Sequence, residues 1–311
     1  MRRVLLILAM SGCASTALFA QQMTYDFLRT DVSARTAALN GSFVSMKDDP
    51  NVLFYNPASI GTLTTPKVSV SYVNHLMDVN AGSLSYGQTL EGVGSVGAGI
   101  LYVNYGSFDR TDESSNDLGT FNAAELALVA GIAAHYDDDI LVGMNVKYIY
   151  SSIAEYTSTA LAVDLGFLYD IPSQNLSIGG SVLNIGKQLK SYAGVNEMLP
   201  LDVKFGITKR PEHLPVFLNI DFHRLNDNVD NFFDRFSNIT LGAEFLMSKS
   251  LRVRVGYNNK QRKELKTGTS AGLGGFSLGA GLVLKDYQID YSYNSYGVFG
   301  GIQRFSLGIN L

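Results

Sequence analysis

The 311-residue chain has little cysteine, little charge and few long apolar runs. Its single cysteine, Cys13, lies within the first twenty residues, so the chain after them can form no disulfide. Charged residues make up 17 %, and no block of lysine or arginine interrupts the sequence, which argues against nucleic-acid binding. After residue 20 no run reaches the roughly 18 apolar residues of a membrane-spanning helix, so the chain has no helix of that kind.

Catalytic and cofactor motifs are missing or stand in the wrong context. Gly92–Gly97 matches G-x-G-x-x-G, but the alternating "AGILYVNYGSF" that follows predicts a strand rather than a helix. The four histidines show no metal-ligand spacing. Asp221 and His223 share one strand face, which favours a hydrogen-bonded pair over a hydrolase that would also need a nearby serine. We therefore expect no enzyme activity, no cofactor and no metal site.

The first twenty residues predict export. Arg2 and Arg3 precede an apolar run that ends in small residues at Ala20, the pattern of a secretory signal peptide cleaved before Gln21. The alternative is a lipoprotein-type site at 10–13, which the apolar run beyond Cys13 disfavours. Removal of residues 1–20 takes two arginines and no acid, so the formal net charge changes from −4 to −4 − 2 = −6.

Strict period-two alternation dominates the rest of the chain. In "ILVGMNVKYIY" (140–150), Val142, Met144 and Val146 share one face, and Asn145 and Lys147 share the other. Segments of about ten residues can cross a bilayer as tilted strands. Fourteen segments follow this pattern: 66–74, 80–90, 92–105, 121–135, 139–151, 157–170, 175–185, 198–209, 214–224, 237–248, 250–258, 271–284, 286–294 and 302–311.

Connections and aromatics distinguish a membrane barrel from a soluble sandwich, which is the alternative. Short turns at 137–139, 248–250 and 285–286 alternate with polar loops at 106–120, 224–237 and 259–270. Tyrosines lie near strand ends, as in interfacial girdles. We therefore predict an all-β, fourteen-stranded outer-membrane barrel over 65–311, in contact with outer-membrane lipid. Its lumen-facing charges would be Lys147, Asp164, Asp202, Lys204, Asp221, Glu244, Arg252, Arg254, Asp290 and Arg304.

Residues 21–64 precede the strands and carry small residues, turn signals and the apolar "VLFY". We expect this segment to fold as a hatch in or under the barrel. Arg35 would fix it by pairing with Asp48 or Asp49, and Asn56 in "NPA" would open its last turn.

The stretch "FLRTDVSARTAALNGSFVSMKDDPNVLFYNPASI" (27–60) resembles the N-terminal signature of the PorV/PorQ family, within the fatty-acid-transporter-like (FadL-like) barrels. The segment "LGAEFLMSKSLRVRVGYNNK" (241–260) is similar to a late strand–turn–strand of that family. "GMNVKYIYSSIAEYTSTALAVDLG" and "LPLDVKFGITKRPEHLPV" resemble the PorQ branch. Together these resemblances extend over nearly the whole mature chain.

This resemblance implies a non-enzymatic role in type IX protein secretion, in which the barrel anchors a PorZ-like protein of the attachment complex at the cell surface. The loop sequence "DNFFDRF" offers Phe232, Phe233 and Phe236 as candidate partner-binding residues, because exposed aromatics mark interfaces. The alternative function is transport of a hydrophobic small molecule such as a long-chain fatty acid.

The predicted topology can be tested by single-cysteine labelling, since the mature chain has no cysteine of its own. We expect an impermeant thiol reagent to label Asn228→Cys in intact cells and to label Asp138→Cys only after the outer membrane is opened. The opposite pattern would invert the orientation.

Overall fold

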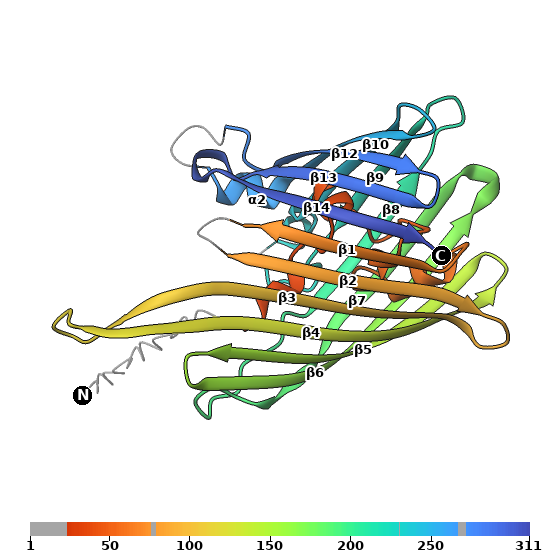
Figure 1. The fold of residues 1–311 in the computed structure, drawn as a ribbon. Helices are drawn as coiled ribbons and strands as arrows, with labels where there is room; N and C mark the ends of the chain where they lie inside the picture. Colours follow the sequence, from red (N-terminus) through yellow and green to blue (C-terminus); the bar gives the residue numbers. More distant parts are fainter. Residues whose placement is uncertain (1–23, 76–78, 230, 267–271) are drawn as a thin grey trace, which may run out of the picture.

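Fourteen antiparallel strands close into one barrel (Figure 1). The computed structural model describes residues 24–75, 79–229, 231–266 and 272–311, so the predicted signal peptide lies outside the described residues. The first strand pairs with the last, from Lys67 opposite Asn310 to Asn74 opposite Gln303, which closes the sheet. The strands are β1 (Lys67–Asn74), β2 (Asn80–Leu90), β3 (Gly94–Thr111), β4 (Asp117–Asp137), β5 (Ile140–Ile153), β6 (Tyr156–Ile171), β7 (Leu176–Lys190), β8 (Asp202–Lys209), β9 (Val216–Phe222), β10 (Ile239–Leu246), β11 (Leu251–Asn258), β12 (Phe276–Leu284), β13 (Tyr287–Ser295) and β14 (Gly301–Asn310).

The apolar face of the wall points outward. On β5, Val142, Met144 and Val146 are 42 %, 44 % and 49 % exposed, whereas Asn145 and Lys147 are buried inside. This arrangement is the reverse of a soluble sandwich, whose apolar faces meet in the core. The predicted fold class, a fourteen-stranded membrane-type barrel, is confirmed.

The connections fall on two rims. We call one the turn rim, which carries the connections 91–93, 138–139, 172–175, 210–215, 247–250 and 285–286. The other, the loop rim, carries the longest connections, 223–238 and 259–275, together with 75–79, 112–116, 154–155, 191–201 and 296–300. Because 154–155 is itself a short turn, the expected alternation of short and long connections holds for most of the barrel but not all of it.

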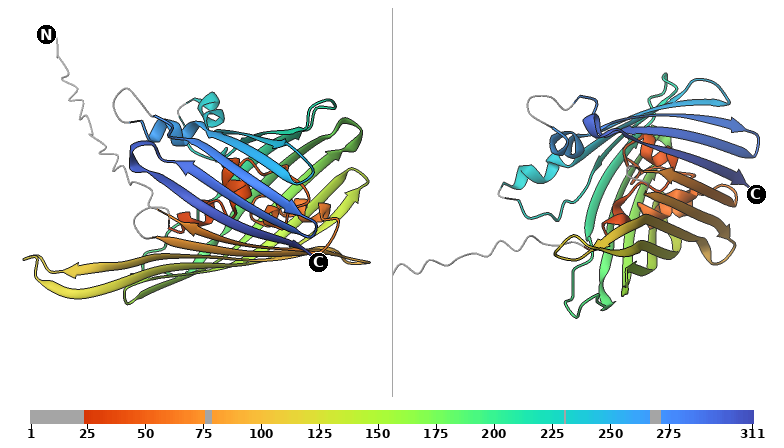
Figure 2. Two further views of the ribbon diagram at one scale, coloured as in Figure 1. Left: turned by 45° about the horizontal axis from the view of Figure 1, so that its top comes forward. Right: turned by 60° about the vertical axis from the view of Figure 1, so that its left-hand side comes forward.

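The predicted loop 106–120 is mostly strand. β3 continues to Thr111 and β4 begins at Asp117, and this hairpin projects beyond the rest of the barrel (Figures 1 and 2). The rings of Phe108 and Phe121 stack across it at 5.4 Å. At its tip, Asp112 accepts hydrogen bonds from the backbone of Ser114 and Asn116, which closes a tight turn. The polar composition thus marked an exposed hairpin rather than a loop.

Further strand boundaries also differ from the predicted ones. β7 runs to Lys190, and β12 starts at Phe276 because a glycine-containing turn at 272–275 precedes it. The two long loops contain short helices, η5 (Phe232–Ser237) and α2 (Asn259–Glu264). No helix in the described ranges is long and apolar enough to cross a membrane.

Residues 24–66, which we call the inner segment, lie inside the barrel (Figure 2). The segment contains η1 (Asp26–Arg29), α1 (Ala34–Ala38), η2 (Pro50–Phe54) and η3 (Pro57–Thr62). Three of its helices begin at capping side chains: Ser33 caps α1, and Asp49 and Asn56 cap η2 and η3, each directly before a proline. α1 packs on β11–β14, and η3 packs on β2–β6.

Small inward residues let the inner segment approach the wall closely. A Cβ on Gly143 would lie 2.5 Å from the backbone of Ala58, and one on Gly179 would lie 2.5 Å from the carbonyl of Val44. Apolar side chains of the segment, including Phe27, Phe43 and Leu53, form one buried cluster with wall residues of β3–β6. The segment therefore fills the space that the inward side chains leave open.

The outward face predicts where a charge is harmful. Val146→Arg, in the middle of β5, should cost about 2–4 kcal/mol because it places a cation at the bilayer midplane. We expect less folded barrel in outer-membrane fractions, measured by heat-modifiable gel mobility. Asp138→Arg, in a turn, serves as the control and should assemble normally. Normal assembly of Val146→Arg would show that this face does not meet lipid.

Candidate functional site

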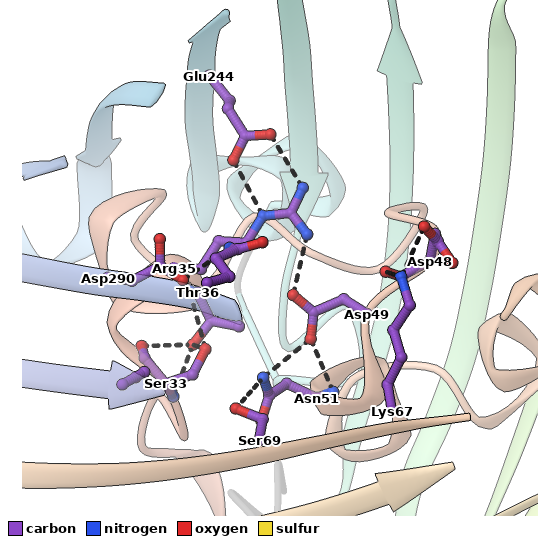
Figure 3. Close-up of polar contacts among 12 residues, drawn as sticks. Ser33, Arg35, Thr36, Asp48, Asp49, Asn51, Lys67, Ser69, Glu244 and Asp290 are labelled. Carbon is purple, nitrogen blue, oxygen red and sulfur yellow. Dashed lines mark hydrogen bonds and ion pairs between the residues drawn. The ribbon is translucent and has the colours of Figure 1, made fainter. Parts of the chain in front are cut away.

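Arg35 joins the inner segment to the barrel wall. Its Nε and one terminal nitrogen donate to the two oxygens of Glu244 on β10, both at 2.9 Å, and the other terminal nitrogen donates to Asp49 at 2.9 Å. Figure 3 shows the guanidinium between the two carboxylates. Burial disfavours the charged form of Arg35, but the carboxylates of Glu244 and Asp49 outweigh burial and raise its pKa above the ordinary value.

Asp49 also organises the chain that follows it. Its second oxygen accepts hydrogen bonds from the backbone and side chain of Asn51, at 2.9 and 2.8 Å. The side chain of Asn51 in turn contacts Ser69 on β1 (Figure 3) and Ser85 on β2. One carboxylate thus starts η2 and connects Arg35 to two wall strands.

Asp48 has a different partner from Asp49. Its carboxylate pairs with Lys67 at 2.7 Å and accepts from the backbone and hydroxyl of Thr64. The sequence left open whether Arg35 pairs with Asp48 or Asp49, and the structure gives Asp49. Because the side chain of Asp48 is 44 % exposed, its ion pair contributes little to stability.

Asn56 ties two parts of the inner segment to the wall. Its oxygen caps η3 at Ala58, and its amide nitrogen donates to the carbonyls of Val44 and Phe167, at 2.9 and 2.8 Å. The side chain is completely buried. Its position explains why an asparagine, which both donates and accepts, precedes Pro57.

Two further ion-pair networks line the interior. Arg254 on β11 donates to Glu244 on β10 and, at 2.7 Å, to Asp290 on β13. On the opposite part of the wall, Lys147 pairs with Asp164 at 2.9 Å. Asp164 also accepts from the backbone of Asn184 at the β6–β7 register shift. These networks hold neighbouring strands in one register.

Nine of the ten lumen-facing charges predicted from the sequence are buried. They are Lys147, Asp164, Asp202, Lys204, Asp221, Glu244, Arg254, Asp290 and Arg304. Arg252 instead lies at the turn rim, where it donates to the carbonyls of Ser248 and Leu251.

The predicted pair of Asp221 and His223 is wrong. His223 shares a hydrogen bond with Thr240, and Asp221 accepts from the backbone of Val44. His223 follows the end of β9, so the alternation that placed the two side chains together no longer applies there.

A cavity of about 340 Å³ lies between the inner segment and the loop rim. Its wall includes Arg29, Lys204, His223, Arg224 and Arg304. The described residues that line it include tyrosines 55 and 296 but no aliphatic side chain and no phenylalanine. Such a surface suits water or a polar ligand. In the described part of the chain, no group of three or more histidine, cysteine, aspartate or glutamate residues could hold a metal ion.

The candidate partner-binding residues lie on η5, at the loop rim. Phe233 is 81 % exposed, whereas Phe236 packs edge-on against Phe222 with ring centroids 5.5 Å apart. The side chain of Phe232 lies outside the described residues. The structure thus gives the two described side chains different surroundings, although the sequence treated all three alike.

Comparison with known proteins finds likeness in structure but not in sequence. No protein-family model matches the chain, and no curated protein matches it. The toluene transporter TbuX of Ralstonia pickettii is 12 % identical, with 89 % of this chain and 96 % of that chain covered and a TM-score of 0.58. The toluene transporter TodX of Pseudomonas putida is 14 % identical, with 89 % and 96 % covered and a TM-score of 0.56. A FadL homologue of Pseudomonas aeruginosa is 11 % identical, with 89 % and 97 % covered and a TM-score of 0.54.

The chain therefore has the fold of the FadL-like barrels, and its closed wall with an outward apolar face is that of an outer-membrane protein. Because these neighbours are only 11–14 % identical to this chain, the likeness shows the fold alone. The finer resemblance to the PorV/PorQ family receives no support from these comparisons.

The Arg35 network predicts that replacing Arg35 lowers the free energy of unfolding much more than replacing Lys67 does. Arg35→Met leaves Asp49 buried without its cation, so the free energy of unfolding should fall by about 3–5 kcal/mol. Lys67→Met removes the partner of the exposed Asp48 and should cost at most about 1 kcal/mol. Denaturant unfolding in detergent, followed by circular dichroism, measures both.

The double variant Arg35→Met/Asp49→Asn should lose less free energy of unfolding than the sum of the losses of the two single variants, because the charges of Arg35 and Asp49 are coupled. Equal effects of Arg35→Met and Lys67→Met would contradict the central place of Arg35.

Proposed function

We propose that this chain is a closed outer-membrane barrel that anchors a cell-surface component of protein secretion, as its resemblance to the PorV/PorQ family implies. The partner would be a PorZ-like surface protein of type IX secretion. The inner segment acts as a permanent hatch in this proposal, and function lies at the loop rim.

The observation that carries this proposal is the filled interior. The inner segment packs its apolar residues against β3–β6, and Arg35 connects it to β10. The remaining cavity at the loop rim is lined by charged and polar groups. A hydrophobic molecule that entered from this rim would have to desolvate those groups without offering them partners, which is unfavourable.

The loop rim supplies a surface that suits a protein partner. Phe233, Leu273, Val298 and Phe299 are exposed large apolar side chains on its connections. Exposed apolar side chains of this size are typical of interfaces. The β3–β4 hairpin extends the same end of the molecule (Figure 2).

A second candidate is passage of a hydrophobic small molecule across the outer membrane. The fold likeness to the toluene transporters favours it, and the comparisons support it better than they support the anchoring role. Fold alone does not fix function. For this chain the second candidate requires that the inner segment move, because its ion pairs and apolar cluster occupy the lumen.

The anchoring proposal predicts that a loop-rim variant loses its partner while the barrel stays intact. Phe233→Ser with Phe236→Ser should release a co-purifying surface protein from native membranes, at least tenfold by quantitative mass spectrometry, which corresponds to about 1.4 kcal/mol. Tyr136→Ser replaces an equally exposed aromatic near the turn rim and should retain that protein.

Recovery of the same proteins with both variants would contradict the anchoring proposal. Uptake of a labelled long-chain fatty acid or toluene into liposomes that contain the purified barrel would instead support the transporter. A deletion strain with normal hydrocarbon uptake and lost surface attachment of secreted proteins separates the two functions.

A further inference from the structure

Arg304 lies inside the barrel, as Arg35 and Arg254 do, but its surroundings differ from theirs. Arg35 and Arg254 each contact two carboxylates, Arg35 with Asp49 and Glu244, and Arg254 with Glu244 and Asp290. Arg304 on β14 is 4 % exposed, and among the described residues no ion pair joins it to a carboxylate. A buried guanidinium without a counter-charge is costly unless water or an anion compensates it.

The guanidinium of Arg304 faces the cavity below the loop rim. One terminal nitrogen donates to the side-chain oxygen of Asn294 at 2.9 Å, and its Nε has no hydrogen-bond partner in the described part of the chain. Arg304 and Asn294 both line the cavity. The fork of a guanidinium is suited to two parallel hydrogen bonds to one carboxylate or phosphate.

Other cations gather on the same cavity wall. Lys204 is buried with Asp202 at 3.5 Å and lies 5.3 Å from the ring centre of Tyr55. Burial and, after it, the nearby charge of Arg224 lower the pKa of Arg29, although the carboxylates of Asp202 and Asp26 act in the opposite direction. The side chains that line the cavity include five lysines and arginines and four carboxylates. Arg304 is the most deeply buried of these cations, and no described carboxylate forms an ion pair with it.

We propose that this cavity binds a small hydrophilic oxyanion, a molecule with carboxylate or phosphate groups, and that Arg304 is its main ligand-binding residue. The volume of about 340 Å³ is at the low end of the roughly 300–1,000 Å³ of small-molecule sites. Since no aliphatic side chain among the described residues lines the cavity, an alkyl tail would meet only the rings of Tyr55 and Tyr296 and the stems of polar side chains there. The ligand class is thus distinct from fatty acids, and the inference does not depend on either proposed function.

The test is isothermal titration calorimetry on the full mature barrel in neutral detergent, with inorganic phosphate, citrate and hexanoate as probes. We expect saturable binding of phosphate or citrate, and weaker binding of hexanoate, whose carboxylate carries an apolar chain. The relative strengths of phosphate and citrate distinguish the two oxyanion classes. Tyr296→Trp places the only tryptophan of the chain on the cavity wall, so a saturable change in its emission gives a second measurement.

The decisive variants change the arginine. Arg304→Gln should weaken binding at least tenfold, or about 1.4 kcal/mol, and Arg304→Lys should weaken it less because the charge remains. Arg252→Gln removes an arginine at the turn rim, which does not line the cavity, and should bind like the wild type. Heat-modifiable mobility shows that each variant is folded, and wild-type thermal stabilisation by the ligand provides a readout that needs no variant.

Three results would overturn the inference. One is the absence of saturable binding of phosphate and citrate to the folded wild type up to about 10 mM, which would mean that water alone solvates Arg304. Another is equal weakening by Arg252→Gln and Arg304→Gln. The third is tighter binding of hexanoate than of citrate, which would identify an amphipathic ligand instead.

Discussion

A wall of fourteen strands encloses more space than its own inward side chains can fill. Many of those inward side chains are small or charged, and β3–β6 add apolar ones such as Leu101, Val103 and Ile149, so the wall alone would leave an open lumen. The inner segment fills that lumen with apolar residues and short capped helices. Its position, the glycines that admit it and the charges that hold it all follow from the width of the barrel.

Charge pairing inside the barrel then fixes where the inner segment lies. The carboxylates that face Arg35 come from η2 and from β10, so one guanidinium joins two elements far apart in the sequence. The ion pair of Lys147 and Asp164 likewise joins β5 to β6 within the wall. Each of these pairs is shielded from water, which makes the loss of one partner costly. Arg304 differs from Arg35 and Arg254 in that no described carboxylate forms an ion pair with it.

Much of the fold could be read from the sequence, because alternation with period two directly reports which side chains face lipid. β5 and β6 lie where Val142–Tyr150 and Leu161–Tyr169 predict them. The polar stretch 106–120 was wrongly predicted to be a loop, since an exposed hairpin and a loop have the same composition. The ion-pair partners of the acidic residues were harder to predict. Asp48 and Asp49 are adjacent in sequence, and only the left-handed backbone of Asp48, with φ +58°, turns them toward different cations. That no described carboxylate pairs with Arg304 has no sequence signal, since it depends on everything that surrounds the residue.

The pairing of β1 with β14 has a consequence for the order of assembly. The inner segment precedes β1 in the chain, whereas β14, which closes the ring, follows the other thirteen strands. The segment must therefore be inside before the seam closes, or thread through a rim afterwards. Once the seam has formed, the segment is held by topology as well as by contacts. A chain cut short before β14 would retain both ion-pair partners of Arg35, Asp49 and Glu244, but would leave its own interior open at one side.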